Sequence, residues 1–221
     1  MIVTIDGPAG SGKSSTARAV ARKLGFHHLD SGAFYRALTL AAIRAGIDES
    51  EWDDLSVQDL ERLGVAASPA ESGFRMTISG TDVGDDIRAQ DVSTRVSRMA
   101  RVPAVREWLL GPLRTLTHGV DLVADGRDMG TVVFPEAGLK VFLVAAPETR
   151  ARRRLAELGN TDPTADELEA EVARLVERDR IDSERAVAPL RRAEDAIVVD
   201  TTDLDFDEQV DRIVELAAER R

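Results

Sequence analysis

The sequence predicts an α/β fold, in which helices cover both faces of a parallel sheet. Short apolar, β-branched runs alternate along the chain with segments in which apolar residues recur at helical spacing. A glycine-rich loop of the phosphate-binding type joins the first such strand to the first helix. The 221 residues, 43% of them hydrophobic, suffice to bury one core, so we expect a single domain.

The glycine-rich loop, residues 7–14, matches the pattern Gly-x-x-x-x-Gly-Lys-Ser/Thr at every fixed position. A β-branched run, residues 2–5, precedes it, and Gly25 ends the helical pattern that follows. In such a loop the backbone N–H groups and the positive end of the helix dipole face the phosphates of a nucleotide. We expect Lys13 to reach the β- and γ-phosphates and the Ser14 hydroxyl to bind a bridging Mg²⁺ ion. The flanking strand and helix argue against the alternative, a glycine-rich turn with an exposed lysine.

The remaining elements follow from the period of the apolar residues. Phe74, Met76 and Ile78 alternate with polar residues, which is typical of antiparallel strands. Elsewhere the period is that of helices or of buried strands. In chain order we expect a strand and a helix over residues 27–43, a loop and a short helix over 48–64, a small antiparallel insertion over 65–87, helices over 92–100 and 105–113, strands at 120–124, 140–144 and 196–200, and helices over 148–158 and 164–180.

The net charge limits the possible partners. The chain carries 29 Lys and Arg against 40 Asp and Glu, a net charge of −11, so we expect no binding to nucleic acid or to a membrane surface. A polyanionic substrate must then meet a local cluster of arginines.

No cysteine is present, which excludes disulfides and thiolate metal sites. With neither a signal peptide nor an apolar run of membrane-spanning length, we expect a cytoplasmic protein.

Two missing patterns narrow the class of nucleotide-binding protein. The guanine-reading Asn-Lys-x-Asp cannot occur, because the only asparagine, Asn160, precedes Thr161, and no Asp-x-x-Gly is present. A kinase instead needs a second anion site facing the γ-phosphate, because two negatively charged reactants must be brought together. Arg36 and Arg127 are candidates, since each closely follows a glycine at the expected carboxyl edge of a strand and guanidinium binds phosphate in a bidentate fork. Taken singly, either arginine equally fits a surface ion pair worth under about 1 kcal/mol.

Three further motifs follow the phosphate-binding loop in order. They are Asp30-Ser31-Gly32-Ala33-Phe34-Tyr35-Arg36, then Ala124-Asp125-Gly126-Arg127-Asp128-Met129-Gly130-Thr131-Val132-Val133-Phe134-Pro135, and finally Arg178-Asp179 with Asp182-Ser183-x-Arg185 and Ala188-Pro189-Leu190. Together with the loop they resemble bacterial cytidylate kinases over almost the whole chain. The resemblance implies a P-loop nucleoside monophosphate kinase fold. It divides the chain into a core of about residues 1–34, 106–149 and 181–221, an enlarged monophosphate-binding insertion of about 35–105, and a short lid of about 150–180.

The resemblance also implies an activity, the transfer of the γ-phosphate of ATP to CMP or dCMP with Mg²⁺, in pyrimidine nucleotide metabolism. We expect a monomer with small-molecule substrates. The implied ATP-binding residues are Gly7, Pro8, Ala9, Gly10, Ser11, Gly12, Lys13, Ser14 and Ser15, and the implied metal ligands are Ser14 and Asp125. The implied CMP contacts are Ser31, Arg36, Ser97, Arg106, Arg127, Asp128, Arg178, Asp182 and Arg185. The implied catalytic residues are Lys13, Arg127, Arg153 and Arg154, the last two belonging with Arg150 to a lid that closes over the transferring phosphoryl group.

Recognition of cytosine has a physical account. Asp128 and the Ser31 hydroxyl would accept hydrogen bonds from the exocyclic amine, while Arg106 would donate to the ring nitrogen and the carbonyl oxygen. Uracil reverses that edge, which would leave a buried carboxylate facing a carbonyl oxygen. Ser15, where the family often has threonine, contacts neither the base nor the acceptor phosphate in this scheme.

Two alternatives remain open. Another small P-loop kinase, acting on uridylate, shikimate or a sugar acid, would share the loop but would have no reason to combine Asp128, Arg106 and Asp182. A non-catalytic nucleotide-dependent binding module would bind ATP or GTP and transfer no phosphate. The arginine-rich acceptor site argues against the second alternative.

Overall fold

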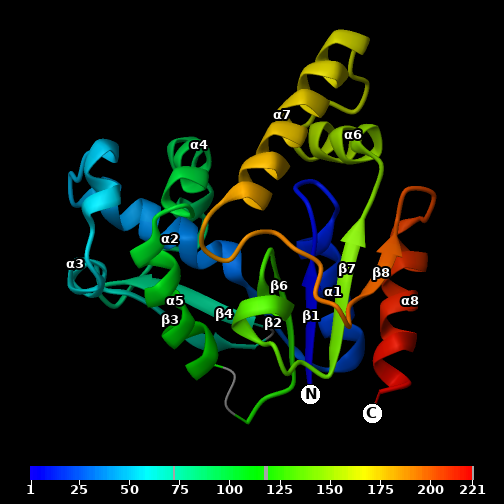
Figure 1. Ribbon diagram of the computed structural model, residues 1–221, viewed down its shortest axis with the longest axis horizontal. Coiled ribbons are helices and arrows are strands. Elements are labelled where there is room, and N and C mark those ends of the chain that lie inside the picture. Colours follow the sequence, from blue (N-terminus) through cyan, green and yellow to red (C-terminus); the bar gives the residue numbers. More distant parts are fainter. Residues whose placement is uncertain (72, 117–118, 221) are drawn as a thin grey trace. The chain divides into compact units, whose positions relative to one another are not determined.

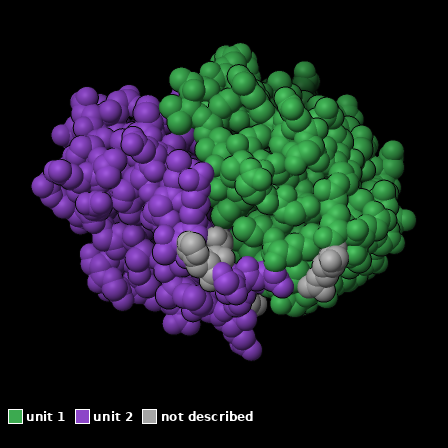
Figure 2. Space-filling view, turned by 60° about the horizontal axis from the view of Figure 1, so that its bottom comes forward, with its two compact units in different colours: residues 1–26, 122–221 green, residues 27–121 purple. Residues whose placement is uncertain are grey.

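The structure, a computed structural model, describes residues 1–71, 73–116 and 119–220. The chain divides into two compact units, one of residues 1–26 and 122–221 and the other of residues 27–121 (Figure 2). Each unit is described by itself. The division into core, insertion and lid stays a prediction. In the part of the chain that is described, no helix is long and apolar enough to cross a membrane.

The first unit contains four parallel strands in the order β6-β1-β7-β8. The register places Ile5 of β1 opposite Asp125 of β6 and opposite Val141 of β7. The strands are β1 (Ile2–Asp6), β6 (Leu122–Gly126), β7 (Leu139–Val144) and β8 (Ile197–Asp200). The predicted parallel sheet is therefore confirmed. The strand expected at residues 120–124 instead runs two residues later, because Leu122 is the residue that pairs with Ile2.

Helices α1 (Lys13–Leu24) and α8 (Phe206–Ala218) lie side by side against this sheet (Figure 1). Together with the strands they enclose a hydrophobic core, in which Val3, Val20 and Ile213 are inaccessible to solvent. Gly25 ends α1 as expected, with φ of 70° and its N–H donating to carbonyl oxygens of the last turn. The sheet and these helices fix the positions of the loops that follow β1 and β6.

A helical hairpin and a π-helical turn complete the first unit. The turn, η3 (Met129–Val133), follows β6 and lies against β1. Helix α6 (Pro147–Glu157) packs on α7 (Ala165–Glu184). A capping box between Thr164 and Glu167 begins α7. The helix continues four residues past the expected end at residue 180, so Asp182 lies on it.

The second unit contains an antiparallel sheet and several helices, as the sequence predicts. Strand β4 pairs with both β3 and β5, and Met76 is the buried residue of β4. Pro103 is the first residue of the helix over residues 103–115, where its missing N–H costs no hydrogen bond. The elements are β2 (His27–Asp30), α2 (Ser31–Arg44), η1 (Glu49–Asp54), α3 (Val57–Arg62), β3 (Val65–Ala70), β4 (Gly73–Ile78), β5 (Thr81–Asp82), η2 (Gly84–Arg88), α4 (Gln90–Met99) and α5 (Pro103–Thr115).

Candidate active site

The phosphate-binding loop leaves β1 in a conformation that its glycines permit. Gly7, Gly10 and Gly12 have φ angles of 155°, 72° and 85°. A Cβ atom at Gly7 would lie 2.1 Å from the carbonyl oxygen of Leu143 in β7, so no other residue fits there. Gly12 forms the N-cap of α1, which places the positive end of the helix at the loop.

Lys13, the first residue of α1, is a buried cation. Its side chain is folded into the loop, where Nζ donates to the carbonyl oxygen of Pro8 at 2.8 Å. The residue is 6% exposed. Burial lowers the pKa of Lys13 well below its usual value, and the nearby charge of Arg127 lowers it further. A phosphate group at this loop would offset both effects, because its negative charge favours the ammonium form of Lys13.

The two predicted metal ligands lie next to each other. The Ser14 hydroxyl donates to Oδ2 of Asp125 at 2.5 Å, and Asp125 is 3% exposed at the end of β6. A hydroxyl and a carboxylate are oxygen ligands of the kind that Mg²⁺ prefers. The residues therefore fit a Mg²⁺ ion at the start of α1.

Four of the predicted substrate residues form one charged cluster in the first unit. Nε of Arg127 donates to Oδ2 of Asp182 at 2.9 Å. Arg185, the C-cap of α7, lies between two carboxylates, with Nη1 at 3.3 Å from Asp182 and Nη2 at 3.7 Å from Asp128. The cluster thus joins the end of β6 to the end of α7.

The arginines of this cluster favour the ionised form of Asp182. Burial opposes ionisation of Asp182, but the charges of Arg127 and Arg185 prevail and hold its pKa below the usual value. Arg178, one turn earlier on α7, lowers the pKa of Asp182 and also that of Lys13. The predicted substrate residues of this unit therefore share one electrostatic environment with the phosphate loop.

The three predicted lid arginines have different surroundings. Arg153 donates to the hydroxyl and the carbonyl oxygen of Thr201, at 2.9 and 2.7 Å. Arg154 forms an ion pair at 3.0 Å with Glu157, one turn further along α6. Arg150 is buried and donates to the carbonyl oxygen of Ala9 in the phosphate loop. The catalytic roles of Arg153 and Arg154 stay predictions.

The other predicted substrate residues belong to the second unit. Asp30-Ser31-Gly32 is the start of α2, where the Asp30 side chain caps the helix and Ser31 is its first, buried residue. Nη1 of Arg36 donates to the hydroxyl of Ser93 at 2.8 Å. Arg106 is 5% exposed, and its guanidinium carbon lies 5.3 Å from the ring centre of Tyr35. Ser97 is half-buried on α4.

Sequence reasoning assigned no role to two carboxylates that hold the site together. Asp6, 4% exposed at the end of β1, accepts the N–H groups of Met129 and Gly130 at 2.9 and 2.7 Å. Burial raises the pKa of Asp6 to about 6. Asp179 on α7 accepts the N–H of Ala9 at 2.8 Å. An acidic residue immediately before Gly7 was the one available signal for Asp6.

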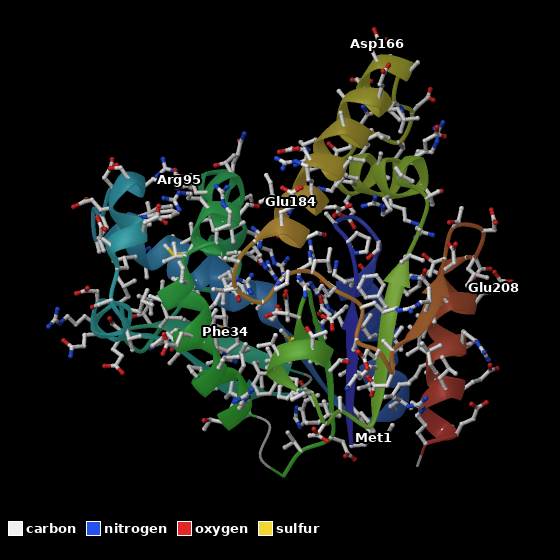
Figure 3. All side chains as sticks on the ribbon, in the orientation of Figure 1. Met1, Phe34, Arg95, Asp166, Glu184 and Glu208 are labelled. Atoms are coloured by element: carbon white, nitrogen blue, oxygen red, sulfur yellow. The ribbon has the colours of Figure 1, made fainter. Side chains whose placement is uncertain are left out.

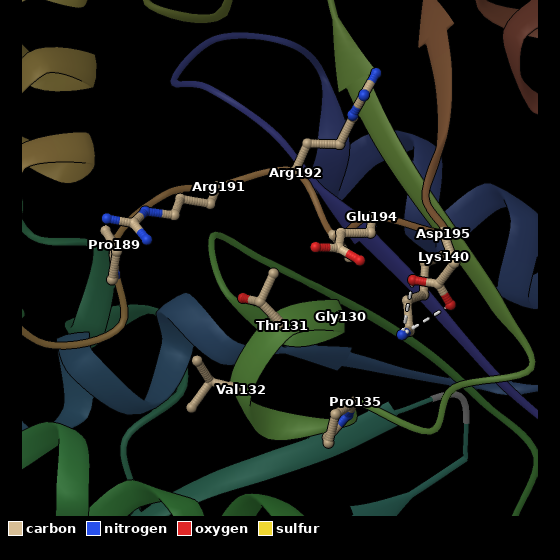
Figure 4. Close-up of a pocket in the computed structure, with 11 residues that line it drawn as sticks. Gly130, Thr131, Val132, Pro135, Lys140, Pro189, Arg191, Arg192, Glu194 and Asp195 are labelled. Carbon is tan, nitrogen blue, oxygen red and sulfur yellow. Dashed lines mark hydrogen bonds and ion pairs between the residues drawn. The ribbon is translucent and has the colours of Figure 1, made fainter.

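A separate cavity of about 390 Å³ lies beside η3 (Figure 4). Lys140 closes one end through an ion pair with Asp195 at 2.9 Å. Glu194 and Thr131 also line it. None of the 11 residues around this cavity is a predicted site residue. The ion pair fixes the segment that leads from α7 to β8, and that segment carries Arg185 at its start.

Comparison with known proteins identifies the family of the chain. The family model described as cytidylate kinase matches residues 3–219. A cytidylate kinase of Mycobacterium avium is 43% identical, over 100% of this chain and 96% of its own length. A cytidylate kinase of Vibrio cholerae is 45% identical, over 97% of this chain and 94% of its own.

One solved structure shows the same fold at low identity. It is an uncharacterised protein from Eubacterium ventriosum, 13% identical, with a TM-score of 0.51 over 100% of this chain and 99% of the other. At that identity the likeness bears on the fold alone. The family model and the full-length relatives go further, and they show that the chain belongs to the cytidylate kinase family.

Proposed function

We propose that the protein transfers the γ-phosphate of ATP to CMP or dCMP, giving ADP and CDP or dCDP. The observation that carries the proposal is the cluster of Arg127, Asp128, Asp182 and Arg185 on the unit that also holds the phosphate loop. Two guanidinium groups provide a site for the acceptor phosphate and its sugar, and the two carboxylates hold them in place. Membership of the cytidylate kinase family supports the same acceptor.

Positioning and charge neutralisation account for the transfer step. Lys13 and Arg127 supply positive charge on the two sides of the transferring group. The charge of Arg127 also lowers the pKa of Lys13. Ser14 and Asp125 would hold Mg²⁺, which when bound neutralises charge on the β- and γ-phosphates. No general base is required, because the acceptor phosphate is already anionic.

Specificity for cytosine rests on one buried carboxylate. Asp128 is 5% exposed, and an ionised carboxylate can only accept hydrogen bonds. It suits the exocyclic amine of cytosine, with the Ser31 hydroxyl as second acceptor and Arg106 as donor to the rest of the base edge. A uracil carbonyl oxygen would face Asp128 without a proton between them, which costs binding energy.

The direct test is an ADP-release assay with ATP, Mg²⁺ and one acceptor at a time: CMP, dCMP, UMP, AMP or shikimate. We expect activity with the two cytidine nucleotides. Activity confined to UMP or to shikimate would favour another small P-loop kinase. Binding of ATP without transfer to any acceptor would favour a nucleotide-dependent binding module.

The base-recognition scheme has its own test. We expect Asp128→Ala to keep ATP binding and to lose most of the preference for CMP over UMP. The matched control is Glu136→Gln, because Glu136 is an exposed carboxylate shortly after η3. Full discrimination between CMP and UMP in the Asp128→Ala protein would contradict the scheme.

We also propose that the protein works as a monomer, which sedimentation of the active enzyme tests.

A further inference from the structure

The tip of the phosphate loop is held by two charged side chains from the α6–α7 hairpin. The N–H of Ala9 donates to Oδ1 of Asp179 at 2.8 Å, and the carbonyl oxygen of Ala9 accepts from Nη1 of Arg150 at 2.7 Å. Nη1 of Arg150 also donates to Oδ2 of Asp179 at 2.5 Å, which closes a ring of three residues. Both polar groups of the Ala9 backbone are therefore bound by this pair.

Packing around the pair leaves the loop little freedom to shift. The side chains of Arg150 and Asp179 are 6% and 18% exposed. Ala9 joins Ala151 of α6 and Leu175 of α7 in a small apolar cluster. The joint between loop and hairpin thus combines a buried ion pair, backbone hydrogen bonds and apolar contact.

The contacts of Arg150 and Asp179 with Ala9 also determine the positions of two charged residues of α7. Arg178 adjoins Asp179, and Asp182 follows one turn later on the same side of the helix. The charges of Arg178 and Asp182 both act on Lys13. In Figure 3, Asp166 marks the start of α7 and Glu184 marks its end. A rotation or a slide of this helix at Asp179 would move both charges relative to Lys13.

We propose that Arg150 and Asp179 are positioning residues, which register α7 on the phosphate loop so that Arg178 and Asp182 are correctly placed for phosphoryl transfer. The proposal rests on the proposed kinase activity. It gives Arg150 a different task from the closing movement that the family resemblance implies. A misplacement of about 1 Å at a distance from the chemistry can reduce a rate roughly a hundredfold.

The first test uses Asp179→Asn and Arg150→Lys. The asparagine variant keeps the size of the side chain but removes its charge, and the lysine variant keeps the charge but replaces the planar fork. We expect kcat to fall about tenfold or more in both, with the dissociation constant of a fluorescent ATP analogue within about threefold of wild type. The control is Glu177→Gln, an exposed residue of α7 paired with Arg180, which should change neither value.

A second variant separates positioning from stability. Removing one partner leaves a buried charge unpaired, whereas replacing both by apolar residues is often neutral or stabilising. The double variant Arg150→Met with Asp179→Leu removes the unpaired buried charge but also both partners of the Ala9 backbone. We therefore expect it to regain only part of the Tm lost in Asp179→Asn, while kcat stays about tenfold reduced. Recovery of kcat together with Tm would overturn the proposal. So would a kcat within twofold of wild type in folded Asp179→Asn protein.

The joint can also be measured without any acceptor. Hydrogen exchange of residues 7–14 in the nucleotide-free protein reports on the Ala9 N–H, which we expect to exchange at least about tenfold faster in Asp179→Asn. An unchanged exchange rate of the Ala9 N–H would show that Asp179 does not hold the phosphate loop, which would refute the proposal. Wild-type protein that transfers nothing to CMP would instead refute the proposed function and leave the exchange result valid.

Discussion

The Ser14 hydroxyl donates a hydrogen bond to Asp125 at 2.5 Å, although 111 residues separate the two in sequence. Parallel pairing of β1 with β6 explains the proximity, because Ile5 and Asp125 are partners at the carboxyl ends of these strands. The phosphate loop and the Asp125–Asp128 motif therefore leave the sheet next to each other. This edge is where open α/β sheets bind their ligands.

We predict that Asp125→Asn weakens the use of Mg²⁺. An amide is a poorer ligand than a carboxylate for this ion, whether it binds directly or through water. We expect the Mg²⁺ concentration for half-maximal activity to rise about tenfold or more. Titration of ADP release with Mg²⁺ at fixed ATP measures it. An unchanged midpoint would remove Asp125 from the metal site.

Lys13→Met should abolish most of the activity without unfolding the protein. In the proposed transfer step the ammonium group contributes to charge neutralisation, so we expect kcat to fall about a hundredfold or more. Because burial already disfavours the charged lysine, the free energy of unfolding should be equal or higher in the variant. Urea unfolding measures the free energy of unfolding, and the ADP-release assay measures kcat. Lys23→Met, at an exposed site, is the control, and normal turnover of Lys13→Met would contradict the assignment.

Gly7→Ala is expected to be strongly destabilising. Its Cβ atom would lie 2.1 Å from the Leu143 carbonyl oxygen, so β1 and β7 would have to separate locally. We expect a loss of about 3 kcal/mol or more in the free energy of unfolding. Gly111→Ala is the comparison, because that glycine lies inside α5 with open space around its Cβ position. It should be neutral or slightly stabilising, and similar losses at both sites would contradict the steric argument.

Asp6 should make stability depend on pH. Its pKa is about 6 in the folded protein against 3.8 for an unperturbed carboxyl, so the folded state binds the extra proton between these values. Stability from this group therefore falls as pH rises through that window and is constant above it. Between pH 4.5 and 7.5 we expect wild type to lose about 2 kcal/mol relative to Asp6→Asn. Urea unfolding of both proteins across this range measures the difference, and a constant difference would refute the raised pKa.

Much of the fold could be predicted because its signals are local. Each signal reflects a local requirement on the backbone conformation. These signals are the loop pattern of residues 7–14, the β-branched residues before it and Gly25 after it. The alternation around Met76 likewise predicted the antiparallel sheet. Ends of elements were less certain: α7 extends to Glu184, because no glycine or proline interrupts it before the C-cap Arg185.

The site was predicted in part. Ser14 with Asp125, and Arg127 with Asp182, came from motifs, and the structure brings each pair together. The sequence assigned no role to Asp6 or Asp179, because their partners are backbone N–H groups distant in sequence. An acidic side chain that accepts from such groups looks like any other acidic residue until the fold is known.

The first unit is interrupted by the second, yet its own core is continuous. Phe26 belongs to that core, and Leu122 begins the strand that pairs with β1, so the chain leaves and re-enters the same packed body. The 95 residues between them are an excursion from a complete phosphate-binding scaffold. Substitutions within the excursion therefore need not disturb the packed body that carries the phosphate loop.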